Sequence, residues 1–131
     1  MKSFLLGVAV LLTLNVFAQQ PVKFKTMKHS FGKVKQHVPA ATTFEFTNVS
    51  SKPVVIETAT ASCGCTTPDY PKGGIAAGKT ATIKVSYNAE AIGPFTKTVT
   101  VKLANMNEPI VLTIDGEVIA QPEKKAPAKK G

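Results

Sequence analysis

The sequence predicts an all-β fold, an immunoglobulin-like antiparallel β-sandwich of about seven strands in about 100 residues. Three observations lead to this prediction. Apolar and polar residues alternate with a period of two in several segments, whereas no segment has the periodicity of a helix. Val and Thr dominate these segments, as is typical of half-buried strands. Turn-forming residues separate the segments at short intervals, which suits two sheets better than the alternative, a small barrel.

Five segments show the alternation most clearly. They are residues 43–47, 54–58, 81–87, 98–103 and 110–118, and a first strand with its turn is expected before them, near Phe24 and Phe31. Phe44 and Phe46 fall on one face of their strand, and Val101 falls on the face opposite Thr100. One face of such a strand packs against the core, so Phe44, Phe46 and Val101 are expected to be buried.

Two groups of turn residues interrupt the strands. Asn48-Val49-Ser50 matches the acceptor pattern for N-glycosylation, but in a bacterial protein we interpret it as a turn. Pro68 and Pro71 follow a small and polar stretch after residue 58. Proline has no N–H to donate to a neighbouring strand. These two residues therefore exclude a central strand at this point.

The first residues predict export. Lys2 provides a positive start, residues 4–14 are almost wholly apolar, and Val16-Phe17-Ala18 suits cleavage by a signal peptidase. The apolar run is shorter than the ~20 residues that span a membrane, which disfavours an uncleaved anchor. We therefore expect residues 1–18 to be a signal peptide and the mature chain to begin at Gln19. The expected location is the periplasm or the outside of the cell.

The charge argues against one class of partner. The formal net charge is +8, and every basic residue is Lys. Arg is preferred for bidentate recognition of phosphate and guanine, so no nucleic-acid partner is expected. Residues 19–119 would form the domain, and residues 120–131, rich in Lys, Pro and Ala, a disordered tail. The charge of this tail would allow weak contact with anionic surfaces of the envelope.

Residues 73–80 match the nucleotide-binding pattern G-x-x-x-x-G-K-[ST]. This motif works only between a buried strand and a helix whose first amides meet the phosphates. Here Pro68 and Pro71 precede it, and the alternating residues 81–87 follow it. We therefore expect a loop between strands, with Lys79 exposed, and no nucleotide as ligand or cofactor.

The two cysteines, Cys63 and Cys65, are separated by Gly64. Residues two apart in an extended chain point the same way, so the sulfurs can meet each other or one ligand. Gly64 would supply the bend that a disulfide between such close residues needs. Three roles stay open: a disulfide or redox pair, ligands of a soft metal such as Cu(I), or thiols that only pack. In the metal alternative, His29 and His37 are the candidates for a third ligand.

The surroundings of the cysteines also resemble a known family. Residues 61–68, A-S-C-G-C-T-T-P, resemble the signature of domain-of-unknown-function family 1573, a family of bacterial exported domains whose most specific motif is S-C-G-C-T. Weaker matches are Phe46, Asn48, Pro53, Gly78, Val85, Tyr87, Gly93-Pro94-Phe95, Lys97 and Gly116. The resemblance covers roughly residues 28–118, and Ala77 departs from it where the family usually has Pro. It implies an immunoglobulin-like fold and an envelope location, and it implies no catalytic residues.

No group of residues indicates an enzyme. Two His, one Cys pair and scattered carboxylates do not define a nucleophile, a base and an orienting group. We therefore expect a non-catalytic, exported domain that interacts with an unknown protein of the bacterial envelope through an exposed sheet edge. The alternative is a protein that binds a metal or transfers electrons through Cys63 and Cys65. We expect this pair at the end of a strand or in the bend after it, with at least one sulfur partly exposed.

Overall fold

The computed structural model describes residues 20–121, and every regular element in this range is a β-strand. The nine strands are β1 (Val22–Phe24), β2 (Lys28–Lys35), β3 (Ala40–Asn48), β4 (Val54–Ala61), β5 (Thr66–Asp69), β6 (Gly74–Ile75), β7 (Thr80–Tyr87), β8 (Gly93–Leu103) and β9 (Ile110–Ile119). The predicted signal peptide and all but the first two residues of the predicted tail lie outside the described residues. In the described range, no helix is long and apolar enough to cross a membrane.

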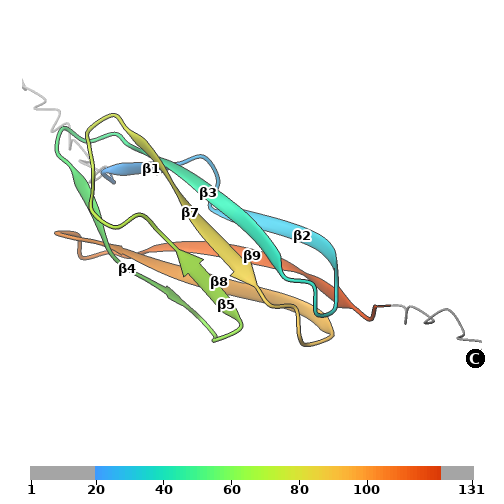
Figure 1. Cartoon of the computed structure of the whole chain (residues 1–131). Helices are drawn as coiled ribbons and strands as arrows, with labels where there is room; N and C mark the ends of the chain where they lie inside the picture. The colour runs from blue at the N-terminus through green and yellow to red at the C-terminus, as the bar shows by residue number, and fades with distance from the viewer. Residues whose placement is uncertain (1–19, 122–131) are drawn as a thin grey trace, which may run out of the picture.

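The strands form two sheets that pack face to face (Figure 1). One sheet has the order β1-β3-β7-β5, and the other has the order β2-β9-β8-β4-β6. Each sheet is built around a long antiparallel pair, β3 with β7 in the first and β8 with β9 in the second. The all-β sandwich predicted from the sequence is therefore confirmed.

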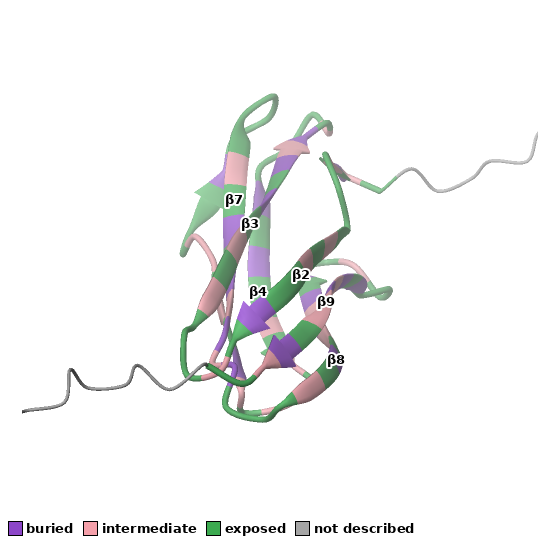
Figure 2. Ribbon diagram, turned by 90° about the vertical axis from the view of Figure 1, so that its right-hand side faces the viewer, coloured by how far each residue is buried: buried purple, intermediate pink, exposed green. Residues whose placement is uncertain are grey.

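The core lies between the two sheets, and Figure 2 shows buried residues recurring along the strands of both. Phe44 and Val101 have no exposed surface, and Phe46 is 1% exposed. Thr100, on the opposite face of β8, is half-buried. The strand register expected from the alternation of residues is thus correct for both sheets.

The structure has more strands than the sequence predicts, because short strands form in segments that look like loops. β5 contains Pro68, which is tolerated because β5 is an edge strand that pairs only with β7. β4 continues to Ala61 rather than ending near residue 58, since β8 extends the ladder beside it. Small and polar residues thus adopt strand structure where a long neighbour supplies hydrogen-bond partners.

One pairing departs from the predicted antiparallel arrangement. β2 runs parallel to β9, with a bulge between Ser30 and Lys33. The first part of the chain is shared between the sheets, because β1 pairs with β3 and β2 then crosses to β9. The chain keeps its direction through this crossing, and β9 runs in the same direction.

A buried side chain holds the turn between β3 and β4. Asn48 has no exposed surface, and its side-chain amide donates to the carbonyl oxygens of Lys52 at 2.7 Å and Ile75 at 2.9 Å. Its side-chain oxygen accepts the Ser50 N–H at 2.9 Å and the Ser50 hydroxyl at 2.6 Å. These contacts agree with the interpretation of Asn48-Val49-Ser50 as a turn. They also fasten this turn to β6.

Candidate functional site

Within residues 20–121, one side of β4 has no strand partner over most of its length. β8 pairs with one side of β4 from Ile56 to Ala61, whereas β6 covers the other side only at Val54 and Val55. We call residues 56–61 the β4 edge. The N–H of the following residue, Ser62, donates to a β8 carbonyl, so the alternation of an antiparallel ladder directs the peptide groups of Ala59 and Ala61 to the open side.

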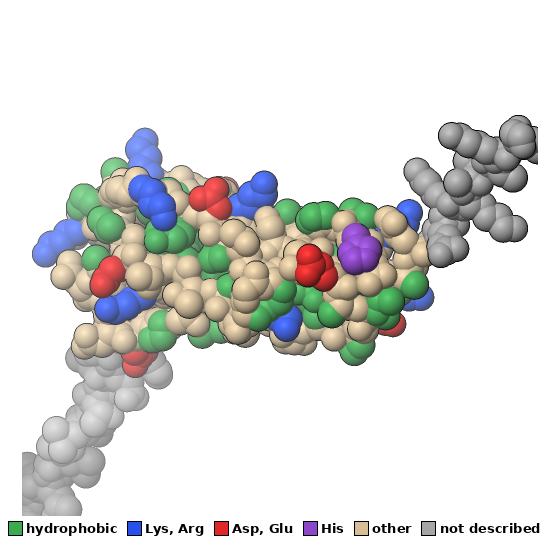
Figure 3. Space-filling view, turned by 60° about the horizontal axis from the view of Figure 1, so that its bottom comes forward, with side chains coloured by type: hydrophobic (Ala, Val, Ile, Leu, Met, Phe, Trp, Pro, Cys, Tyr) green, Lys and Arg blue, Asp and Glu red, His purple; other side chains and the backbone are tan. Residues whose placement is uncertain are grey.

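The β4 edge lacks the lysines and the proline that protect two other edges. It has one register irregularity, between Ile56 and Thr58, and its pairing with β8 is continuous from Thr58 to Ala61. β2 carries three lysines and a bulge, and β5 contains Pro68. The β4 edge has neither Lys nor Pro, and its one charged residue, Glu57, pairs with Lys102 of β8 at 3.4 Å. Figure 3 views the molecule from the side where β4 and β5 lie in Figure 1, and uncharged side chains and backbone cover most of this face. An extended chain would therefore meet little electrostatic obstruction there.

The segment after β4 crosses from one sheet to the other. At its start, Ser62 makes two hydrogen bonds to Thr98 of β8: its N–H donates to the carbonyl oxygen at 2.9 Å, and its hydroxyl accepts the N–H at 3.1 Å. At its end, the Asn88 N–H donates to the Cys65 carbonyl oxygen at 2.9 Å. A further bond from the Thr66 N–H to the Cys63 carbonyl oxygen, 3.3 Å long, closes a β-turn. We call residues 62–66 the Cys turn.

Cys63 and Cys65 form a disulfide inside the Cys turn, with their Cα atoms 5.4 Å apart. This separation lies within the range of about 4.4–6.8 Å that disulfides require. Both residues are partly exposed, and Cys65 also packs against the core. The pair lies directly after a strand end, where the sequence predicts it.

The bend at Gly64 does not need glycine, contrary to the sequence-based expectation. Gly64 is not among the residues with positive φ, and a Cβ atom added to it would meet nothing within 4 Å. The bend comes from the ordinary β-turn instead. What glycine does provide is an uncovered surface between the two cysteines.

Thr66 is a site residue that the sequence does not single out. It is 4% exposed, and its hydroxyl oxygen lies 3.8 Å from Cys63 Sγ and 4.0 Å from Cys65 Sγ. Disulfide sulfurs carry no hydrogen, so the single hydroxyl proton of Thr66 is the one that the two sulfurs can accept. The signal in the sequence is weak: Thr66 begins a strand in which it alternates with the exposed Thr67.

The role of Cys63 and Cys65 as ligands of a metal such as Cu(I) stays a prediction. The two sulfurs bond to each other in the structure, so a metal would need the reduced pair. His29 lies in β2 against the Phe31 ring, and the N–H of His37 donates to the Ala89 carbonyl oxygen at 3.0 Å. Among residues 20–121, no three His, Cys, Asp or Glu side chains gather where they could hold a metal ion.

The segment that matches the nucleotide-binding pattern is a connection between strands. It contains the two-residue strand β6, Lys79 is exposed, and β7 begins at Thr80 where the motif would need a helix. The backbone of Lys79 has a structural role, because its carbonyl oxygen accepts the Asn48 N–H at 2.9 Å. The loop and the exposed lysine are as predicted.

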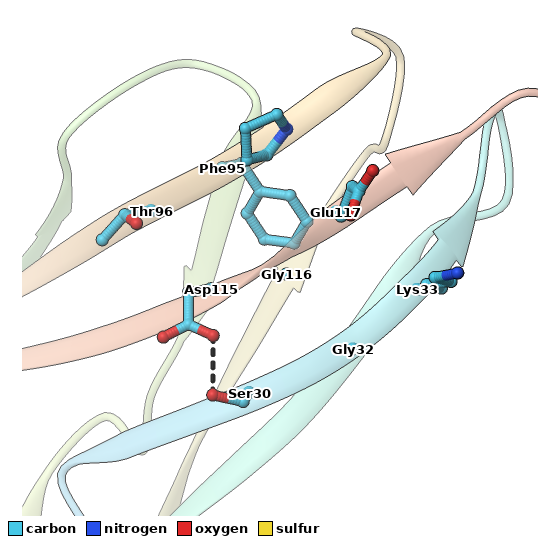
Figure 4. Close-up of a pocket in the computed structure, with 9 residues that line it drawn as sticks. Ser30, Gly32, Lys33, Phe95, Thr96, Asp115, Gly116 and Glu117 are labelled. Atoms are coloured by element: carbon cyan, nitrogen blue, oxygen red, sulfur yellow. Dashed lines mark hydrogen bonds between the residues drawn. The ribbon is translucent and has the colours of Figure 1, made fainter.

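A hollow of about 440 Å³ lies between β2, β8 and β9 (Figure 4). Asp115 accepts a hydrogen bond from the Ser30 hydroxyl at 2.6 Å and pairs with Lys28 at 3.2 Å. These contacts, the Ser30 bond first, lower the pKa of Asp115. Because the pKa of Asp115 is lower in the folded protein than in the unfolded chain, these contacts stabilise the fold fully when the pH is above the pKa of the unfolded chain. The stabilisation is lost as the pH falls through the pKa of the folded protein. The contacts of Ser30 and Lys28 with Asp115 thus join β2 to β9.

Comparison with known proteins gives a family and a fold. The family model described as "Protein of unknown function (DUF1573)" matches residues 22–118. No curated protein sequence matches the chain. Among solved structures, the ASH/PapD-like domain of human CEP192 (PapD-like domain 7) has a TM-score of 0.65 at 9% identity, covering 77% of this chain and 87% of that chain.

Two bacterial structures are also similar. A protein of unknown function from Porphyromonas gingivalis W83 has a TM-score of 0.64 at 12% identity, covering 79% of this chain and 51% of that chain. The VesB protease of Vibrio cholerae has a TM-score of 0.59 at 12% identity, covering 74% of this chain and 32% of that chain. At such identities the likeness shows a shared fold alone. The matched residues, 22–118, include both the β4 edge and the Cys turn.

Proposed function

Because this chain belongs to the DUF1573 family of proteins of unknown function and has a PapD-like, immunoglobulin-like fold, we propose that it is a protein-interaction domain of the bacterial envelope. In this role it is non-catalytic. Its partner is another envelope protein, which contributes an extended segment. That segment pairs with the β4 edge and adds a strand to the sheet.

The observation that carries this proposal is the open β4 edge. The peptide groups of Ala59 and Ala61 face the open side, and a strand that pairs there would satisfy them. The side chains from Thr58 to Ala61 are small, and Glu57 is already paired with Lys102. Main-chain hydrogen bonds would supply the affinity, and contacts with the flanking side chains would supply the specificity.

Export supports the envelope as the place of action. Residues 1–18 have the pattern of a signal peptide, and a disulfide persists in an oxidising compartment such as the periplasm. The intact mass of the protein recovered from the envelope tests this part. We expect a chain that begins at Gln19, and a mass that includes residues 1–18 would contradict cleavage.

Photo-crosslinking in living cells tests the interaction. A photoreactive amino acid replaces the exposed Thr60 of the β4 edge, and in a matched control it replaces the exposed Lys33 of the lysine-rich β2 edge. We expect a discrete adduct with one envelope protein from position 60 and none from position 33. Equal adducts from the two positions would contradict a specific role of the β4 edge.

Two substitutions then separate backbone pairing from side-chain contact. Ala59→Pro removes an outward N–H without removing a bond to β8, whereas Ala59→Ser keeps that N–H. The adduct should disappear with Pro and persist with Ser. Thr58→Lys, which places a charge on the edge at another exposed position, should weaken the adduct in the same way if the Pro variant does not fold. An adduct unchanged in Ala59→Pro and Thr58→Lys would reject strand addition.

A further inference from the structure

We propose that the Cys63–Cys65 disulfide is a thiol–disulfide exchange site that oxidises a dithiol of another protein, with the Thr66 hydroxyl as hydrogen-bond donor to the reacting sulfurs. This activity does not depend on strand addition at the β4 edge. Three features of the Cys turn lead to it: the turn is held by bonds other than the disulfide, both cysteines are partly exposed, and the hydroxyl of a buried threonine lies near both sulfurs.

The Cys turn keeps its anchors when the disulfide opens. The bonds between Ser62 and Thr98 fix its start, and the bond from Asn88 to the Cys65 carbonyl fixes its end. A disulfide across one intervening residue also restricts the unfolded chain very little, so the fold depends on it only weakly. The oxidised and reduced pairs can therefore interconvert while the protein stays folded.

The two sulfurs differ in their surroundings. Both cysteines are partly exposed, but of the two only Cys65 packs against the hydrophobic core. Gly64 leaves open space beside them, because even an added Cβ would meet nothing within 4 Å. An incoming thiolate would thus attack Cys63 Sγ, and Cys65 would leave as the thiolate.

Thr66 is placed to assist this departure. Thr66 is only 4% exposed, and its hydroxyl oxygen lies within 4.0 Å of both sulfurs. A hydroxyl donates more strongly to a thiolate than to a disulfide sulfur, because a hydrogen bond to a charged acceptor is the stronger one. Such a bond stabilises the departing thiolate, and a more stable leaving thiolate leaves faster.

The exchange has two steps. In the first, a thiolate of the partner attacks Cys63 Sγ, so that a mixed disulfide forms as the Cys63–Cys65 bond breaks. The Cys65 thiolate then takes up a proton. The second thiol of the partner loses its proton and attacks the partner's own sulfur in the mixed disulfide, releasing Cys63, which is protonated in turn. Two electrons and two protons pass from the partner dithiol to Cys63 and Cys65, and the partner gains a disulfide. Exchange with another protein disulfide reverses these steps and restores the oxidised pair.

Redox titration of the full-length protein tests the proposal. The protein is equilibrated in buffers of reduced and oxidised glutathione, the thiols are trapped with iodoacetamide and counted by mass, and circular dichroism follows the fold. We expect a reversible transition between two thiols and none, with an unchanged β-sheet spectrum. A pair that stays oxidised in every buffer, or that is reduced only when the sheet signal is lost, would overturn the proposal.

Substitutions at Thr66 and Cys65 test the roles of the residues. Thr66→Val should slow reduction by dithiothreitol by about three- to tenfold, since the departing thiolate loses the hydrogen bond that stabilises it. Thr66→Ser should restore the rate, and Val at the exposed neighbouring position, Thr67→Val, should leave it unchanged. Cys65→Ser should trap a mixed disulfide on Cys63 more readily than Cys63→Ser traps one on Cys65. Equal rates in Thr66→Val and the unsubstituted protein would remove Thr66 from the mechanism, and equal trapping would contradict the order of attack.

Discussion

The turns at the two ends of β4 are built in different ways. The turn before β4 is held by Asn48, a side chain with no exposed surface that bonds to Lys52, Ile75 and Ser50. The turn after β4 contains a covalent bond between Cys63 and Cys65, yet both residues are partly exposed. The stronger bond thus lies where it restricts the chain least, and the weaker bonds lie where they join distant segments.

This difference separates stability from reactivity. The Asn48 contacts reach across as many as 27 residues of sequence, to Ile75, and they satisfy the polar atoms of a side chain that has no exposed surface. The Cys63–Cys65 bond has a sequence separation of 2, so it removes little freedom from the unfolded chain. We infer that the first turn is a structural element and that the second is the chemically active one.

The largest expected effect comes from removing the Asn48 side chain. Asn48→Ala should lower the free energy of unfolding by about 3 kcal/mol, because it removes several hydrogen bonds, including the buried bond to the Ile75 carbonyl oxygen. Urea denaturation measures the loss, with Val49→Ala as a control, since Val49 is exposed and should change stability by less than about 0.5 kcal/mol. A similar small effect for both variants would mean that Asn48 does not hold the turn.

Removing the disulfide should have a smaller effect. The double variant Cys63→Ala with Cys65→Ala should lose no more than roughly 1.5 kcal/mol, the loop-entropy value for a ring of about three residues. The comparison is made in urea on the oxidised protein and the double variant, side by side with Asn48→Ala. A loss larger than that of Asn48→Ala would reverse the comparison between the two turns.

The sequence predicts the framework of the fold well, for a physical reason. Alternation places Phe44, Phe46 and Val101 in the core because a half-buried strand exposes only one face. It does not predict β5 or the end of β4, where small and polar residues pair only because β7 and β8 lie beside them. Propensity is overridden there by tertiary contacts.

The candidate site is harder to predict than the fold. The motif identifies Cys63 and Cys65, but a local pattern cannot show that Thr66 is buried with its hydroxyl facing the sulfurs. The open β4 edge is equally hidden, because an edge is defined by which strands are absent from one side of it. Both features depend on segments that are distant in sequence, and periodicity says nothing about those.

Glycine substitutions sharpen the comparison. Gly78, whose N–H donates to the Asn48 carbonyl oxygen at 2.8 Å, has φ of +77°, whereas Gly64 is not among the residues with positive φ. Gly78→Ala should cost about 1 kcal/mol, since an L-residue is strained in the left-handed region. Gly64→Ala should be neutral or stabilise the fold by up to about 0.5 kcal/mol. Thermal unfolding of the two variants checks this order, and a larger loss for Gly64→Ala would mean that the Cys turn is the more constrained of the two.

The smallest expected effect concerns Lys79, which lies in the segment that matches a nucleotide-binding motif. Its carbonyl oxygen accepts the Asn48 N–H, but its side chain is exposed. Lys79→Ala keeps the backbone contact and removes only the exposed side chain, so the free energy of unfolding should change by less than about 0.5 kcal/mol. A nucleotide site would also need a helix after the loop, and β7 occupies that position. Isothermal titration of ATP into the unsubstituted protein and into Lys79→Ala should therefore give no binding heat. Binding that is present in the unsubstituted protein and lost in Lys79→Ala would give this loop a ligand, and the turn before β4 could no longer be described as purely structural.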